Sequence, residues 1–249
     1  MSTDRLLTFH NDLKEWNIEL SAKQDEQFLL FYELLVEWNS FMNLTAITDF
    51  DEVMKKHFLD SLAFVRFLQE KENESVDFSS YKFSLIDVGT GAGFPGIPLA
   101  ILFPNAQFVL MDSLNKRINF LNEVVAKLQL KNVTCVHSRA EDLARKPEYR
   151  EQFDYAVSRA VANLSTLTEY CIPFVKVNGS FISYKSEKLH EELLLAKNAL
   201  HLLSVKESKQ ISFTLPSSDI YRTLLILNKV APTAKKYPRK AGLPGKEPL

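Results

Sequence analysis

The fold is decided by the stretch Leu85-Ile-Asp-Val-Gly-Thr-Gly-Ala-Gly-Phe-Pro-Gly96, which holds four of the seven glycines. The apolar run at its start predicts a strand, and the segment 94–103 has the periodicity of a helix. Glycine adopts positive φ angles at a sharp turn and lets the backbone approach a ligand closely. We therefore predict a strand, a ligand-binding loop at Gly89, Gly91 and Gly93, and a helix.

Beyond this loop, short apolar runs alternate with longer segments of helical periodicity. This order favours a parallel, doubly wound sheet with helices on both faces. The predicted strands cover 85–88, 107–111, 132–137, 153–157 and 179–184. The predicted helices cover 94–103, 114–129, 161–174 and 187–203, with a short one near Glu141.

Two further β-like runs, 210–215 and 221–229, follow with no helix between them. Such runs, joined here by the turn residues 216–219, form an antiparallel hairpin. A mostly parallel sheet that ends in a hairpin is the layout of Rossmann-like class I S-adenosylmethionine methyltransferases, whereas a two-halved dinucleotide-binding fold repeats strand, helix and strand. The sequence thus predicts an α/β fold of the class I methyltransferase type, with a mostly parallel sheet and a C-terminal antiparallel hairpin.

The chain before the glycine loop is expected to be an N-terminal helical extension over residues 1–80. Ser21 and Gln24 have the spacing of a capping box, and apolar residues then recur at helical spacing from Phe28 onward. We assign residues 81–230 to the S-adenosylmethionine-dependent domain. The last segment, 231–249, is rich in proline and in basic residues, and we expect it to be a tail.

The composition is that of an ordinary globular protein without an excess of positive charge. The net charge of −1 lacks the overall basic field of a free nucleic-acid binder, so any contact with RNA needs local patches. There is no run long enough to span a membrane and no signal-peptide pattern, so we expect a cytoplasmic protein. The two cysteines, Cys135 and Cys171, and the five scattered histidines predict no metal site.

The glycine pattern alone leaves the cofactor open. Gly89-x-Gly91-x-Gly93 fits the loop of methyltransferases, and Gly91-x-Gly93-x-x-Gly96 fits the dinucleotide pattern. A nicotinamide-dependent oxidoreductase is therefore the alternative interpretation. A non-catalytic RNA-binding protein with a degenerate cofactor fold is a third.

Two acids that end predicted strands bear on this choice. Asp87 is expected to face the loop where a cationic amino-acid moiety lies, and a carboxylate there would repel a pyrophosphate. Asp112 lies where an acid accepts the ribose hydroxyls of either cofactor. Asp87 thus favours S-adenosylmethionine as the cofactor, while Asp112 supports the predicted fold more than it distinguishes between the two cofactors.

Several motifs occur along the chain: Trp38-Asn39, Asn43–Thr45, His57–Ser61, Asp87–Pro98, Asp112–Arg117, Arg139–Glu141, Ser158–Val161 and Lys236–Lys240. In this order they resemble the RsmG family, formerly GidB. The resemblance implies a bacterial 16S rRNA guanine-N7 methyltransferase that modifies the 530 loop near the decoding centre. Its cofactor would be S-adenosylmethionine, and its product S-adenosylhomocysteine.

The resemblance also implies cofactor contacts. Those that carry over from the family are Gly89, Phe94, Ala140, Glu141 and Arg159. By their placement at strand ends and in the loop we add Asp87, Gly91, Gly93, Asp112 and Ser113 to the predicted cofactor site.

The predicted reaction needs positioning rather than a general base. Guanine N7 has a free lone pair and no proton to remove, and a methyl sulfonium is already an activated electrophile. Placement of two reactants is worth about 7–11 kcal/mol in well-oriented cases. No residue is therefore assigned as catalytic with certainty, and the candidates are Arg159 and Lys185, which follow predicted strands.

The partner is expected to be 16S rRNA within the small ribosomal subunit or an assembly intermediate, bound by a monomer. The basic tail with one aromatic ring suits phosphate contact and base stacking, although an isolated tail of this kind is often only solvated. For His57, a role as a hydrogen-bonded histidine in the core is as well supported by the sequence as a role in binding RNA. The RNA-binding candidates are Asn39, Asn43, Thr45, His57, Arg117, Lys185, Lys235, Lys236, Tyr237, Arg239 and Lys240.

Overall fold

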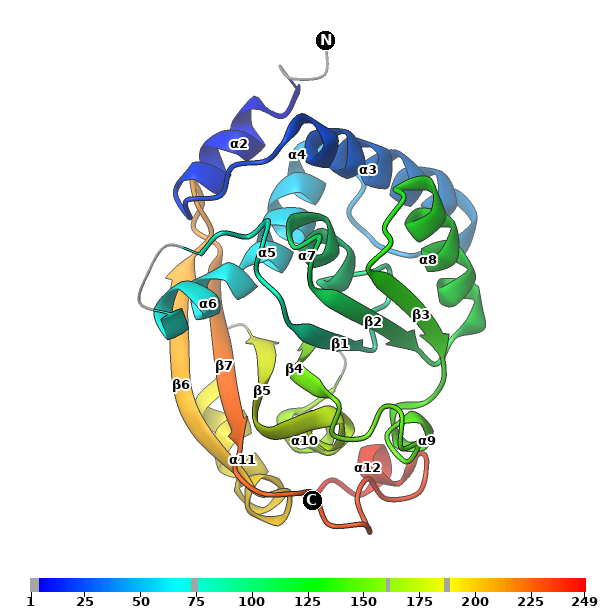
Figure 1. The fold of residues 1–249 in the computed structure, drawn as a ribbon, viewed down its shortest axis with the longest axis vertical. Helices are drawn as coiled ribbons and strands as arrows, with labels where there is room; N and C mark the ends of the chain where they lie inside the picture. Colours follow the sequence, from blue (N-terminus) through cyan, green and yellow to red (C-terminus); the bar gives the residue numbers. More distant parts are fainter. Residues whose placement is uncertain (1–4, 73–75, 160–161, 186–188) are drawn as a thin grey trace.

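The computed structural model describes residues 5–72, 76–159, 162–185 and 189–249, and it shows a sheet covered by helices on both sides (Figure 1). The sheet has seven strands in the order β3-β2-β1-β4-β5-β7-β6. The strands are β1 (Ser84–Val88), β2 (Gln107–Asp112), β3 (Val133–His137), β4 (Phe153–Arg159), β5 (Val175–Lys185), β6 (Val205–Thr214) and β7 (Tyr221–Lys229).

The strand pairing confirms the predicted α/β fold with its C-terminal hairpin. Strands β1 to β5 pair in parallel, and β7 runs antiparallel to both β5 and β6. Strand β6 begins at Val205, earlier than predicted, because Val205 pairs with Lys229 beyond a register shift between Glu207 and Lys209. Pairing with the neighbouring strand, rather than alternation of its own side chains, sets the length of this edge strand.

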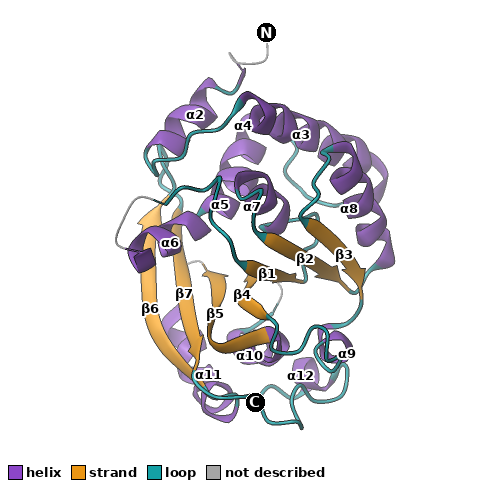
Figure 2. Ribbon diagram, viewed as in Figure 1, coloured by secondary structure: helices purple, strands orange, loops and turns teal. Residues whose placement is uncertain are grey.

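Helices cover both faces of the sheet (Figure 2). On one face lie α2 (Leu7–Lys14), α3 (Ala22–Met42), α4 (Phe50–Val53), the π-helix η1 (Met54–Leu59), α5 (Asp60–Leu62), α6 (Phe64–Glu72), α7 (Gly96–Leu102) and α8 (Asn115–Lys127). On the other lie α9 (Ala140–Leu143), α10 (Leu164–Cys171), the short 3₁₀ helix η2 (Ile172–Phe174), α11 (Leu189–Leu202) and α12 (Leu243–Lys246).

Alternation along the strands divides the hydrophobic core between these two faces. Leu85 and Phe108 belong to the core under the N-terminal helices, while Ile86 and Phe181 belong to the core under α10 and α11. Successive side chains of a strand point to opposite faces, so each strand contributes to both cores. This is the burial expected of a parallel sheet that is covered on both sides.

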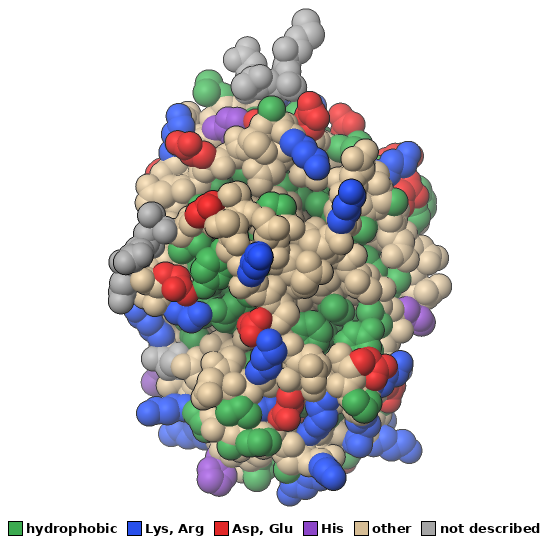
Figure 3. All heavy atoms as spheres, in the orientation of Figure 1, with side chains coloured by type: hydrophobic (Ala, Val, Ile, Leu, Met, Phe, Trp, Pro, Cys, Tyr) green, Lys and Arg blue, Asp and Glu red, His purple; other side chains and the backbone are tan. Residues whose placement is uncertain are grey.

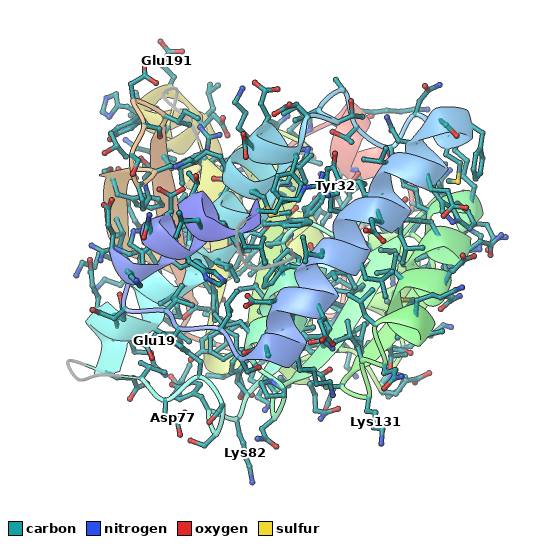
Figure 4. All side chains as sticks on the ribbon, turned by 90° about the horizontal axis from the view of Figure 1, so that it is seen from above. Glu19, Tyr32, Asp77, Lys82, Lys131 and Glu191 are labelled. Carbon is teal, nitrogen blue, oxygen red and sulfur yellow. The ribbon has the colours of Figure 1, made fainter. Side chains whose placement is uncertain are left out.

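The N-terminal helices pack directly on the sheet. Phe28 and Phe58 lie in the same core as Leu85. Helix α3 begins with the predicted capping box: the Ser21 hydroxyl accepts from the Gln24 backbone N–H, and the Gln24 side chain accepts from the Ser21 N–H. Seen from above, α3 crosses the molecule beside α8 (Figure 4). These helices therefore cover the face of the sheet next to the glycine loop.

Some predicted helix boundaries differ from the observed ones. The predicted helix 161–174 is divided into α10 and η2, and its first described turn is capped by Asn163, whose side chain accepts from the Thr166 N–H at 3.0 Å. The starts of two predicted helices, residue 161 and residues 187–188, lie outside the described residues. Helix ends depend on such local hydrogen bonds, which apolar periodicity does not reveal.

Candidate active site

A cleft of about 690 Å³ lies at the carboxyl edge of the sheet, where β1 and β2 end. Open α/β sheets bind ligands at this edge. The opposite edge of the sheet, where the parallel strands begin, is marked in Figure 4 by Lys82, which precedes β1, and by Lys131, which precedes β3. We call it the amino edge. The cleft is lined by Leu44, Thr45, His57, Val88, Gly89, Thr90, Gly91, Ala92, Phe94, Met111, Asp112, Ser113, Arg117, Ser138, Arg139, Ala140, Glu141, Arg159, Tyr170 and Gly242.

The glycine loop forms the floor of the cleft. Gly89, Gly91 and Gly93 have φ angles of 73°, 62° and 94°, which L-residues with side chains rarely adopt. A Cβ atom on Gly91 would meet nothing within 4 Å, so the loop leaves open space on the cleft side. Gly96 serves packing instead, because a Cβ there would lie 2.1 Å from Leu110 Cδ2.

Asp87 lies behind the loop and does not line the cleft, which differs from the predicted direct contact. It is wholly buried, and its Oδ2 accepts hydrogen bonds from Thr90 Oγ1 at 2.7 Å and from the Gly96 N–H at 2.9 Å. Burial raises the pKa of Asp87 to about 7, against the opposing effect of these two donors. The carboxyl group thus fixes the shape of the loop.

Asp112 lines the cleft and ties three of its parts together. Its Oδ2 accepts from the Gly91 N–H at 3.1 Å and from Arg117 Nη1 at 3.0 Å, and its Oδ1 accepts from the Leu114 N–H at 2.9 Å. Ser113 follows directly in the cleft wall. Arg117, predicted from the sequence as an RNA contact, therefore lies beside the predicted cofactor acid.

Ala140 and Glu141 form the wall that follows β3, as the sequence predicts. Glu141 is 4% exposed, and its Oε1 accepts a hydrogen bond from the Gly242 N–H at 2.7 Å. Tyr170 completes this side of the cleft, and its pKa is raised by burial and by the charges of Glu141 and Glu169. The sequence did not indicate Tyr170 or Gly242, since neither belongs to a motif.

An aromatic and cationic cluster forms the opposite wall. The rings of His57 and Phe94 stack at 4.7 Å with an interplanar angle of 17°, and the Arg159 guanidinium lies 5.1 Å from the Phe94 ring centroid. Cations lie favourably over aromatic faces. Phe94 also packs against Phe31 of α3, so the N-terminal helices help to place this wall.

Asp60 joins two arginines from distant strands. Its Oδ2 accepts from Arg159 Nη1 at 2.8 Å, and its Oδ1 accepts from Arg222 Nε at 2.8 Å. The Asp60 side chain is only 4% exposed. Arg222 was not predicted from the sequence, because a lone arginine on a hairpin strand carries no motif.

His57 is held as a neutral ring. Burial, followed by the charge of Arg159, lowers its pKa to about 4. Its Nδ1 lies 3.4 Å from Arg159 Nη2, and its Nε2 forms a hydrogen bond of 2.8 Å with Thr45 Oγ1. Thr45 is fixed in turn by its own N–H, which donates to Asn39 Oδ1 at 2.8 Å. Asn43, in contrast, is an exposed C-cap of α3 in the left-handed region.

A second cavity of about 520 Å³ adjoins the cleft, because both are lined by His57 and Arg159. The sequence-predicted Lys185 lies here, and its Nζ donates to Glu192 Oε2 at 2.5 Å. Basic residues outnumber acidic ones among its lining residues, so the cavity suits an anionic or electron-rich ligand. The residues that line this cavity are Ile47, Lys56, His57, Asp60, Arg159, Ala162, Tyr184, Lys185, Glu192 and Arg222.

The basic segment after β7 divides into inward and outward residues. Lys235, Lys236 and Lys240 are exposed, as a phosphate contact requires. Tyr237 is only 4% exposed, and Arg239 pairs with the buried Glu169. The stacking ring and the phosphate-binding arginine expected from the sequence therefore point into the protein in this structure.

Three further features concern metal sites, membrane spans and surface charge. Among the described residues, no three His, Cys, Asp or Glu side chains are placed to share a metal ion. No helix in the described part of the chain has the length and apolar character needed to cross a membrane. The face drawn in Figure 3 mixes basic and acidic side chains, with Lys and Arg gathered toward its lower end.

Comparisons with known proteins show similarity over most of the chain. The family model described as rRNA small subunit methyltransferase G matches residues 24–221. The chain is 52% identical over 242 residues to Ribosomal RNA small subunit methyltransferase G of Lachnoclostridium phytofermentans, covering 97% of this chain and 96% of that protein. It is 48% identical over 236 residues to the protein of the same name from Alkaliphilus metalliredigens, covering 95% of each.

Solved structures share the fold at low sequence identity. MtNAS in complex with MTA and tNA superposes with a TM-score of 0.54 at 11% identity, covering 83% of this chain and 71% of that one. A mutant of MtNAS in complex with S-adenosylmethionine gives the same TM-score and identity, with 73% of that chain covered. These likenesses concern the fold.

Proposed function

The chain belongs to the rRNA small subunit methyltransferase G family, and we propose that it transfers a methyl group from S-adenosylmethionine to N7 of a guanine in the 530 loop of 16S rRNA. The class of reaction and the RNA follow from membership of the family. The choice of N7 and of the loop rests on the resemblance of the motifs. Membership also sets aside the nicotinamide-dependent and non-catalytic alternatives.

The cleft residues fit S-adenosylmethionine. The open space at Gly91 gives room for a ligand to approach the backbone closely. The carboxylates of Asp112 and Glu141 are acceptors for the ribose hydroxyls and for the adenine side, and Arg159 is a cation for the carboxylate of the methionine moiety. When bound, the cofactor supplies a methyl group on an electrophilic sulfonium.

The second cavity is the proposed place of the guanine. Arg159 and His57 line both spaces, so a base in the second cavity would lie next to a ligand in the cleft. Lys185 and Arg222 supply cationic donors for a phosphate or for the base edge. Enzymes that modify a base take it out of its stack, and a cavity of this kind is required to hold it.

Orientation carries the reaction in this proposal. Attack by N7 removes no proton, and the neutral His57 is already hydrogen-bonded through Nε2 to Thr45 Oγ1. Arg159 is fixed by Asp60, so its guanidinium needs little reordering when ligands bind. The site residues thus bind, orient and exclude water, while the electrons move between N7 and the sulfonium methyl.

Contact with the RNA is assigned to residues around this site. The exposed Lys235, Lys236 and Lys240 are available for phosphates, and Asn39 and Thr45 line or support the mouth of the cleft. The net charge of −1 favours rRNA within the small subunit or an assembly intermediate over naked RNA. We propose that a cytoplasmic monomer performs the reaction.

The single observation that supports the proposal most strongly is a cofactor-sized cleft that shares His57 and Arg159 with a cationic cavity. The test is transfer of labelled methyl from S-adenosylmethionine to small subunits that lack N7 methylation, with the modified base mapped. We expect label at one guanine N7 of the 530 loop. Label on another base, or none despite bound cofactor, would overturn the proposal.

Matched lysine variants connect this assay to the cavity. Lys185→Met is expected to lower transfer at least tenfold, because a cationic donor to the substrate is lost. Lys82→Met, at the amino edge of the sheet, is the control and is expected to leave transfer unchanged (Figure 4). Equal activity of the two variants would remove the second cavity from the substrate site.

A further inference from the structure

We propose that the C-terminal segment 237–244 is a wall of the cofactor site that holds Glu141 in place, and that it controls affinity for S-adenosylmethionine rather than binding RNA. This inference rests on the proposed function of the cleft. It also assigns a role to a segment whose basic composition alone suggested an RNA-binding tail.

The contact between the segment and the cleft is direct. Gly242 lines the cleft, and its backbone N–H donates to Glu141 Oε1 at 2.7 Å. Glu141 is 4% exposed, so loss of the Gly242 N–H would deprive a nearly buried carboxylate oxygen of this hydrogen bond. The carboxylate has a second oxygen, Oε2, that remains able to accept from an amino group on a ligand.

Gly242 suits this contact for a conformational reason. Its φ is +84°, in the left-handed region, and it is the N-cap of the short helix α12. A side chain would strain the backbone there, although a Cβ atom would meet only Arg139 Nη1, at 3.9 Å. The direction of the N–H toward Glu141 thus depends on a conformation that glycine adopts readily.

A buried ion pair anchors the segment just before this glycine. The Arg239 guanidinium donates through Nε to Glu169 Oε1 at 3.0 Å and through Nη2 to Oε2 at 2.7 Å. The Arg239 backbone N–H donates to the same carboxylate at 2.7 Å. The Glu169 side chain is 0% exposed, so this pairing is shielded from solvent and fixes the chain.

Further hydrogen bonds hold the segment on both sides of Arg239. Arg145 donates to the carbonyl oxygen of Pro238 at 2.5 Å, and Arg150 donates to that of Tyr237 at 2.9 Å. On the other side, the Thr166 hydroxyl donates to the carbonyl oxygen of Pro244 at 3.0 Å. Figure 1 shows α12 lying beside α9 and α10. Residues 237–244 are therefore a docked element of the fold.

The test compares two glycine variants of the full chain, Gly242→Ala and Gly245→Ala. Gly245 has no positive φ, and a Cβ there would make only an ordinary contact with Tyr170 Oη at 3.5 Å, so it is the matched control. We expect Gly242→Ala to raise the Kd for S-adenosylhomocysteine about tenfold, since strain at such a site is of the order of this change. Gly245→Ala should stay within about twofold of wild type.

The same variants are measured for binding to a 16S rRNA fragment. Unchanged RNA affinity with weakened S-adenosylhomocysteine binding supports the proposal. Weakened RNA binding with unchanged S-adenosylhomocysteine binding would overturn it, as would two variants that both match wild type. If the wild-type chain itself bound no S-adenosylhomocysteine, the proposed function would fail first, which distinguishes the two failures.

Hydrogen exchange on the wild-type chain keeps the proposal testable if Gly242→Ala does not fold. We expect S-adenosylhomocysteine to slow exchange of the Gly242 amide, because a ligand on Glu141 stabilises the Gly242 N–H contact. The RNA fragment alone should leave that amide unchanged. Slowing by RNA and not by S-adenosylhomocysteine would contradict the assignment.

Discussion

Replacement of Asp60 by Asn tests whether one buried carboxylate holds the active-site arginine. Asp60 accepts from Arg159 Nη1 and from Arg222 Nε, each at 2.8 Å. The Asp60→Asn variant keeps the shape of the side chain but loses the charge, and its amide places a donor against a guanidinium. Both arginines then lack their counter-charge in a site where Asp60 is 4% exposed.

The magnitude follows from this burial. Breaking a fully buried ion pair costs about 3–5 kcal/mol, and the partial exposure of the two arginine side chains, 15% and 26%, reduces our expectation to about 2–3 kcal/mol. For a chain of this size that loss corresponds to a fall in Tm of about 4–12 °C. We also expect a higher KM for S-adenosylmethionine, since Arg159 is no longer held at the cleft.

Scanning calorimetry and steady-state methyl transfer measure these two effects. The control is Lys176→Met, which removes an ion pair of 2.7 Å to Asp154 whose side chains are 45% and 38% exposed. An exposed pair contributes less than about 1 kcal/mol, so this variant should melt close to wild type. If Asp60→Asn melts no lower than Lys176→Met and keeps its KM, the reasoning about Asp60 is wrong.

Two other predictions concern the neutral histidine and the glycine loop. Because the pKa of His57 is lowered to about 4 in the folded chain, the unfolded chain takes up the proton first as pH falls from 6.5, and the contribution of His57 to stability declines through that window, while the raised pKa of Asp87 acts in the opposite direction. The loss reaches about 2 kcal/mol at pH 5, and in urea unfolding at pH 5 and 7.5 the His57→Gln variant should lack it. Gly96→Ala should cost about 1–3 kcal/mol of stability, because the added Cβ would clash with Leu110. Gly91→Ala has open space around the added Cβ but a φ of +62°, and it should chiefly weaken S-adenosylhomocysteine binding. Equal stability of the two glycine variants in calorimetry would contradict this division of roles.

The sequence by itself determined the strand, loop and helix around the glycines. Apolar alternation and positive-φ glycines act over a few residues, so the start of the sheet and the cleft floor at Gly89 and Gly91 are visible in the chain. Topology then places the ends of parallel strands at one edge, and this predicted Asp112, Glu141 and Arg159 as neighbours in the cleft. The hairpin was predicted from the missing helix between two strands.

Only the tertiary structure decided which polar side chains meet. Asp60 and Arg222 are 162 residues apart, and Glu141 and Gly242 are 101 apart, so no local pattern links them. Burial likewise places Asp87 behind the loop and Tyr237 in the core, although position at a strand end suggested ligand contact for Asp87 and the basic tail suggested it for Tyr237. Periodicity records the face on which a residue lies. The pairing of polar groups in a closed interior depends on every element packed around them, because each buried donor or acceptor must find a partner there.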